Sequence, residues 1–111
     1  MLSKVNRLTK KNDFDLVFKN GKSEKKGLLI FKFLKNNLGS TRVGFVVSKK
    51  ISNKASIRNK VKRRLRNIVQ KQLKNKENSL DIIIVALSGI EKKDFLETEE
   101  MATFLLKKII N

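Results

Sequence analysis

The residues best suited to chemistry form a dense group of cations in the middle of the chain. Nine Lys or Arg fall within 18 residues, at Lys49, Lys50, Lys54, Arg58, Lys60, Lys62, Arg63, Arg64 and Arg66. Four of the six Arg lie between Arg58 and Arg66, although Lys is the usual cation elsewhere in the chain. A guanidinium group is planar and presents a fork of donors that matches a phosphate. This segment therefore favours binding to a polyanion.

The distribution of charge supports the same interpretation. The net charge is +17, and residues 25–76 contain 17 Lys or Arg without a single Asp or Glu. A compact body with this charge repels itself, so a polyanionic partner is the best explanation. A bias of the genome toward Lys and Asn codons would raise the number of lysines, but it does not explain where the cations lie.

Residues for catalysis by the polypeptide itself are missing. The chain has no His and no Cys, which removes the commonest general base and the thiolate metal ligands. It also lacks a Walker loop, a GxSxG sequence and an HExxH sequence. The acids at Asp13 and Asp15 and at Glu97, Glu99 and Glu100 fall at expected helix starts, where the helix dipole explains them. We expect no catalytic residue and no metal site made by protein side chains alone.

Helices and strands must position the cations. Apolar residues at helical spacing predict helices over Asn12–Asn20, Asn53–Leu73 and Thr98–Ile110. Asn12 is expected to cap the first helix, and Gly21 to end it in the left-handed conformation. β-Branched and apolar runs predict strands over Leu28–Leu34, Arg42–Ser48 and Asp81–Leu87, with a weaker one at Lys22–Lys25. The run at Asp81–Leu87 is apolar enough to be a central strand buried on both faces.

The wheel of the middle helix separates an apolar stripe from the cations. The stripe consists of Ile57, Val61, Leu65, Ile68, Val69 and Leu73. Asn59, Arg63, Arg66 and Gln70 point away from it. In the closing helix, Met101, Phe104, Leu105 and Ile109 are expected to face the core. Phe14 and Phe18 share one face of the first helix and are candidates either for the core or for stacking on unpaired bases.

Three other function classes fit less well. A helix-turn-helix needs a partner helix just upstream of the basic helix, whereas a strand is predicted there. A membrane-surface helix needs a free apolar face, which the core occupies here. We therefore expect neither DNA nor a membrane as partner. A ribosomal or other structural RNA-binding protein shares the charge and fold class and stays an alternative. We expect no signal peptide in the first ten residues and a cytoplasmic location.

The residues resemble one family over nearly the whole chain. Arg58–Arg66 (RNKVKRRLR) is similar to the signature helix of the protein subunit of bacterial ribonuclease P, R-N-R-x-K-R-x-x-R. The preceding RVGFVVSKK (Arg42–Lys50) resembles the family's strand that ends in S-K-K. Asp13–Gly21 (DFDLVFKNG) resembles its D-F-x-x-V-F-x-x-G helix. Two positions depart from the pattern, because Lys60 replaces an Arg and Lys32 replaces a frequent aromatic residue.

The resemblance implies an α+β fold with the order helix, three strands, helix, strand, helix. It implies a central four-stranded sheet packed with helices, and a left-handed crossover between the parallel strands. Residues 1–111 would form a single RNA-binding domain. The alternation of side chains along a strand then directs Leu29, Phe31 and Phe33 into the core.

The resemblance also implies a division of labour in a ribonucleoprotein endonuclease. The partner is a catalytic RNA that removes the 5′ leader of precursor tRNA with Mg²⁺ bound chiefly by RNA, while the polypeptide is not catalytic. The residues implied to contact the RNA subunit are Lys49, Lys50, Lys54, Arg58, Asn59, Lys60, Lys62, Arg63 and Arg66. Those implied to line a groove for the single-stranded leader are Phe14, Phe18, Ile30 and Lys32.

Overall fold

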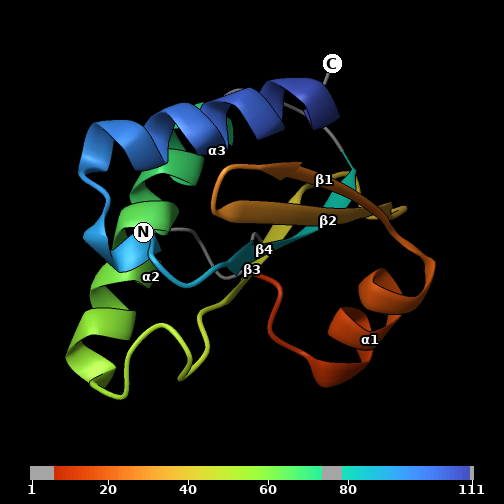
Figure 1. The fold of residues 1–111 in the computed structure, drawn as a ribbon. Helices are drawn as coiled ribbons and strands as arrows, with labels where there is room; N and C mark the ends of the chain where they lie inside the picture. The colour runs from red at the N-terminus through yellow and green to blue at the C-terminus, as the bar shows by residue number, and fades with distance from the viewer. Residues whose placement is uncertain (1–6, 74–78, 111) are drawn as a thin grey trace.

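The computed structural model describes residues 7–73 and 79–110. Residues 1–6, 74–78 and 111 lie outside the described part. The prediction that the first ten residues form no signal peptide therefore falls mostly outside it. Lys74 and Lys76, two lysines of the window without acids, also lie outside it. The order of helices and strands is the predicted one, and a short 3₁₀ turn is added between the last strand and the last helix (Figure 1). The elements are α1 (Lys11–Asn20), β1 (Lys22–Lys26), β2 (Leu29–Lys35), β3 (Arg42–Val46), α2 (Ala55–Leu73), β4 (Leu80–Ala86), η2 (Ile90–Lys92) and α3 (Phe95–Ile110).

The four strands form one mixed sheet in the order β1-β2-β4-β3. The strand β4 lies between β2, to which it is antiparallel, and β3, to which it is parallel. Its seven residues are buried apart from Val85. The prediction that this run is the central strand is therefore confirmed, and the weak strand near Lys22 is present as the edge strand β1. The helix α2 connects the two parallel strands, as predicted.

The two faces of the sheet have different cover. Leu29, Phe31 and the even-numbered isoleucines of β4 face the main core, which α2 and α3 complete. The opposite face carries a smaller cluster of Leu8, Val17 and Ile83 under α1. Figure 1 shows α1 and α3 on opposite sides of the strands. Because α1 is short, it leaves part of its face of the sheet uncovered. None of the described helices is both long and apolar enough to cross a bilayer.

Both ends of α1 differ from the prediction. The helix begins one residue earlier, its cap position is Lys10 rather than Asn12, and no side chain caps it. Gly21 is extended, with φ −81°, and not left-handed. A Cβ at Gly21 would lie 2.5 Å from the Val17 carbonyl oxygen and 2.7 Å from that of Phe33. Glycine is needed there because two backbones approach closely, which a single-sequence pattern of helix ends does not reveal.

The last helix also differs in two respects. It begins at Phe95, because Asp94 accepts hydrogen bonds from the Glu97 N–H to its carboxylate (2.8 Å) and from the Thr98 hydroxyl to its carbonyl (3.0 Å). The prediction that Phe104 faces the core is wrong, since 46% of this residue is exposed. Its ring lies near the ammonium groups of Lys26 and Lys108, at 4.7 and 5.8 Å from the ring centre. The ring therefore packs at the rim between α3 and the edge strand.

Candidate nucleic-acid interface

The helix α2 keeps its apolar stripe in the core and turns most of its polar residues outward. Val61, Leu65, Ile68 and Val69 are buried. Asn59, Lys60 and Arg63 are exposed, and Gln70 continues the same side. The separation predicted from the helix wheel is confirmed for these positions. The exposed row contains no acid, which is unusual for a solvated helix face.

Arg66 departs from the prediction that it points directly away from the core. Arg66 is half-buried, and its guanidinium lies 5.7 Å from the centre of the Phe45 ring. Lys62 is also half-buried and lines the same cavity as Arg66. The reason is that this border of α2 lies beside Phe45 of β3, a contact that the wheel of one helix does not contain. The guanidinium therefore sits over an aromatic face, which orients it.

Arg64 has a structural partner. Its guanidinium donates to the Lys93 carbonyl oxygen at 3.2 Å and so ties α2 to the segment before α3. It was the one cation of the segment that the family motif did not assign to RNA contact. Its hydrogen bond explains an arginine at this position without any ligand.

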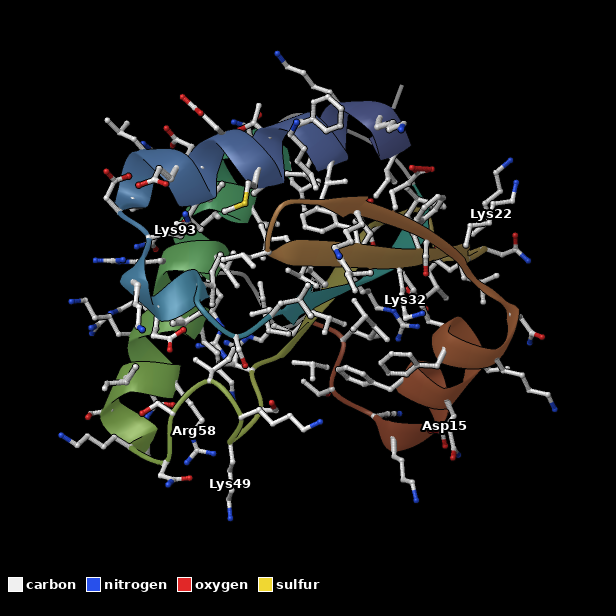
Figure 2. The ribbon with its side chains drawn as sticks, viewed as in Figure 1. Asp15, Lys22, Lys32, Lys49, Arg58 and Lys93 are labelled. Carbon is white, nitrogen blue, oxygen red and sulfur yellow. The ribbon has the colours of Figure 1, made fainter. Side chains whose placement is uncertain are left out.

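The loop between β3 and α2 presents three exposed lysines, Lys49, Lys50 and Lys54. Its backbone is held by turns in which Ser48 Oγ accepts from the Lys50 N–H (3.2 Å) and Ser52 Oγ accepts from the Lys54 N–H (3.1 Å). Figure 2 shows Lys49 and Arg58 at the end of the molecule where this loop enters α2. The loop cations thus extend the exposed row of α2 toward β3.

One donor of the Arg58 guanidinium lacks a hydrogen-bond acceptor in the described part of the protein. Its Nε is shielded from solvent and has no hydrogen-bond partner among the described residues. An unmade hydrogen bond at a shielded donor costs free energy. A bound acceptor, such as a phosphate oxygen beside this guanidinium, would remove the cost.

The other predicted set, Phe14, Phe18, Ile30 and Lys32, divides into two places. Phe14 lines a cavity of about 230 Å³ together with Gly44, Phe45, Lys62 and Arg66, so it faces α2. A Cβ on Gly44 would lie 2.4 Å from Phe14 Cζ, which shows how closely α1 packs on β3. The cavity thus joins a residue predicted to bind the leader to residues predicted to bind the RNA subunit.

Ile30 and Lys32 lie on the part of the sheet that α1 leaves uncovered, and Phe18 of α1 lies beside Lys32. Phe18 is 44% exposed, and the Lys32 ammonium lies 5.6 Å from the centre of its ring. The same ammonium donates to Ser23 Oγ at 3.1 Å, so this cation is held in place over the sheet. Figure 2 shows Lys32 between the strands and α1.

The strand register adds two residues that sequence reasoning missed. Ile30 pairs with Val85, and Val85 pairs with Val46, so the three form one row across the sheet. All three are half-buried. We call Phe18, Ile30, Lys32, Val46 and Val85 the open sheet surface. The alternation of side chains along a single predicted strand does not reveal which residues of the neighbouring strands lie beside it. Only the register places Val46 and Val85 in the same row as Ile30.

No carboxylate of residues 7–73 and 79–110 forms an ion pair with a cation of α2 or of the loop before it. In the described part of the chain, ion pairs join Arg42 to Asp13 and Asp81, Lys93 to Glu97, and Lys108 to Glu24. None of these pairs includes a cation between Lys49 and Arg66. Over residues 7–73 and 79–110, no group of three or more His, Cys, Asp or Glu converges on a point that could hold a metal ion. The arrangement can bind phosphates and stack bases, but it offers no carboxylate cluster for metal-assisted hydrolysis.

Known proteins share both the sequence and the fold. The family model described as Ribonuclease P matches residues 2–110. The ribonuclease P protein component of Syntrophomonas wolfei is 37% identical over 108 residues, covering 97% of this chain and 90% of that protein. That of Legionella pneumophila strain Corby is 43% identical over 90 residues, covering 81% and 76%. The RNase P protein of Staphylococcus aureus superposes with a TM-score of 0.88 at 29% identity, covering 97% of this chain and all of that one. The RNase P protein of Thermotoga maritima, solved in complex with 1-(4-fluorophenyl)-2-thiourea, gives 0.83 at 34% identity, covering 91% and 97%.

Proposed function

Because this chain belongs to the ribonuclease P protein family of bacterial type, we propose that it docks through α2 onto a catalytic RNA and holds the 5′ leader of precursor tRNA on its open sheet surface. As a ribonuclease P protein component, it is part of an endoribonuclease holoenzyme. The observation that carries the proposal is the exposed face of α2 and its preceding loop, whose cations have no carboxylate partner among the described residues.

The cations act by neutralising phosphates. The proposed contact to the RNA subunit consists of eight cations and one neutral amide. The cations are Lys49, Lys50, Lys54, Arg58, Lys60, Lys62, Arg63 and Arg66, and the amide is that of Asn59. Each phosphate that they neutralise releases counterions, so affinity falls steeply as salt rises. Two RNAs repel each other where the substrate meets the catalytic RNA, and cations fixed there reduce that repulsion. The protein thereby increases substrate affinity without supplying a nucleophile.

The open sheet surface has the composition that a single strand of RNA needs. Phe18 offers an exposed ring for a base, Ile30, Val46 and Val85 offer apolar area, and Lys32 offers a cation for a phosphate. Base stacking on an aromatic side chain tolerates any base. A leader that varies between tRNAs can therefore bind by the same contacts.

Catalysis belongs to the RNA in this proposal. The described residues form no cluster of metal ligands, and we propose that Mg²⁺ is held chiefly by RNA. We also propose that the whole chain, residues 1–111, acts as one RNA-binding domain in the cytoplasm. The relatives and solved structures named above are all ribonuclease P proteins, which favours this role over a ribosomal or purely structural one.

A reconstitution tests the proposal directly. The protein is mixed with a bacterial ribonuclease P RNA at low Mg²⁺, and cleavage of a precursor tRNA is followed on a gel. We expect accurate removal of the leader by the mixture, and no cleavage by the protein alone or by the RNA alone at that Mg²⁺ concentration. A mixture no more active than the RNA alone would reject the proposed function.

Phe18 gives a local test of the open sheet surface. Replacing Phe18 with Ala is expected to reduce affinity for the leader by about 1–3 kcal/mol, the range measured for stacking on aromatic side chains. The fold should tolerate it, because the ring is 44% exposed. Affinity is measured with precursor tRNA that carries a leader and with mature tRNA, on the reconstituted holoenzyme.

The matched control is Leu16→Ala, which removes an apolar side chain of the same helix that is 50% exposed. We expect it to leave leader affinity unchanged. Equal losses for the two variants would mean that α1 contributes only its general stability. Phe14→Ala is a less specific test, because Phe14 is half-buried over Gly44 and its loss lowers stability as well.

A further inference from the structure

Arg42, at the start of β3, makes three hydrogen bonds to two carboxylates from different parts of the chain. Its Nε and one terminal nitrogen donate to both oxygens of Asp81 on β4, at 2.9 and 2.6 Å. Its other terminal nitrogen donates to Asp13 on α1 at 3.2 Å. The rigid guanidinium fork is suited to this arrangement, since lysine presents a single point of charge. One side chain therefore connects the sheet to α1.

The sheet side of this connection is firmly held. Asp81 is 6% exposed, and it accepts a further hydrogen bond from the Asn36 side-chain amide at 2.7 Å. The same amide also donates to the Ser40 carbonyl oxygen, at 3.2 Å. The hydrogen bond with Asp81 is the main cause that raises the pKa of Arg42. Both oxygens of Asp81 are thus occupied, and the remaining donor of Arg42 is directed at α1.

Just before α1, Leu8 is buried and its N–H donates to the Val43 carbonyl oxygen at 2.9 Å, which holds the chain that leads into the helix. The first turn of the helix itself has fewer anchors. The helix α1 has only ten residues and no side-chain cap, and its one buried residue is Val17, in the second half. Phe14 packs over Gly44, but it is only half-buried. Asp13 lies in the first turn, so its contact with Arg42 fixes the end of α1 that Val17 does not reach. Phe14 follows Asp13 directly, and Phe18 lies four residues beyond Phe14 on the same face.

From this geometry we infer that Arg42 is a positioning residue for leader binding: through Asp13 it fixes the placement of α1 over the sheet, and with it the spacing between Phe18 and the rest of the open sheet surface. The inference rests on the proposed role of that surface in holding the leader. Arg42 need not touch RNA in this role. Its effect on RNA is confined to the substrate segment that lies beside α1.

The test compares two substitutions on the same helix. Asp13→Asn removes the ion pair with Arg42, so that at most a neutral hydrogen bond to the amide oxygen remains, and it leaves the Arg42–Asp81 pair in place. Asp15→Asn is the matched control, because Asp15 is exposed and forms no ion pair among the described residues. Figure 2 shows Asp15 on the side of α1 that faces away from the sheet. Both substitutions remove one negative charge from α1, so general attraction to RNA changes equally.

We expect Asp13→Asn to lower the affinity of the reconstituted holoenzyme for precursor tRNA about threefold relative to Asp15→Asn, the size expected for a partly exposed ion pair. Affinity for tRNA without a leader should be the same for the two variants. A purely structural role would not produce a difference confined to the leader. The charge-preserving Asp13→Glu should recover part of the loss.

Two outcomes overturn the inference, and they are distinguishable. If the wild-type holoenzyme prefers the leader and Asp13→Asn keeps that preference as well as Asp15→Asn does, Arg42 does not position α1 for binding. The same conclusion follows if Asp13→Asn weakens both RNAs equally. If the wild-type holoenzyme shows no preference for the leader, the proposed role of the open sheet surface fails, and the inference fails with it.

Discussion

Replacing Arg63 and Arg66 together with Ala is expected to weaken assembly with the RNA subunit by about 3–6 kcal/mol, because two charge-assisted hydrogen bonds to phosphate are lost at about 1.5–3 kcal/mol each. The slope of log affinity against log salt should fall by about 1.5, since two phosphates are no longer neutralised. Filter binding or fluorescence titration over a range of salt concentrations measures both quantities.

The two arginines differ in what else their loss removes. Arg63 is exposed, so its replacement should affect RNA affinity alone. Arg66 also packs over Phe45, and its loss removes a cation–π contact of about 0.5–1 kcal/mol from the fold. Thermal unfolding of the single variants separates these effects, and Arg63→Ala is the cleaner probe of docking.

The control for charge is a double variant that removes two exposed lysines outside α2, Lys25→Ala with Lys107→Ala. It lowers the net charge by the same amount. We expect a much smaller loss of affinity, because these positions lie on the edge strand and on α3. A loss as large as that of the arginine variant would show that only total charge matters, and would contradict docking through α2.

The sequence predicted those parts of the fold that a single element encodes. The apolar stripe of α2 has a period near 3.6 residues, and its burial follows from that period alone. The predicted run at Asp81–Leu87 is apolar after its first residue, which identifies a strand covered on both faces. The exposed cations were predicted by the same reasoning, because they occupy the opposite side of an element whose buried side was clear.

The remaining features depend on contacts between elements. The guanidinium of Arg66 on α2 lies over the ring of Phe45 on β3. Val46 and Val85 join Ile30 because of the register of three strands. Such contacts bring together residues far apart in the chain, and neither helical nor strand periodicity carries that information. The candidate site was therefore predicted best on α2 and least well on the sheet.

The acids show the same limit. At helix starts, Asp13 and Asp15 are explained equally well by the helix dipole. In the structure, Asp13 binds Arg42, whereas Asp15 forms no ion pair among the described residues. The spacing of two carboxylates along one helix could not distinguish them, because the partner lies on another element 29 residues away.

Replacing Arg42 with Ala should destabilise the fold by about 3–5 kcal/mol, the cost of removing one partner from a buried ion pair. Asp81 is 6% exposed, and without Arg42 the one hydrogen bond that its carboxylate keeps among the described residues is that from Asn36. A domain of this size is stable by about 5–15 kcal/mol in total. We expect the melting temperature to fall by about 10–20 °C, measured by circular dichroism or calorimetry.

The double variant Arg42→Ala with Asp81→Asn tests the cause of that loss. An amide at position 81 has no charge to leave unpaired, so the double variant should be more stable than Arg42→Ala alone. If it is not, the loss comes from the packing of the Arg42 side chain rather than from the carboxylate. Asp13→Asn should cost less than about 1 kcal/mol, since this pair is partly exposed. The same arginine would then contribute stability through Asp81 and helix placement through Asp13, and the two contributions can be measured separately.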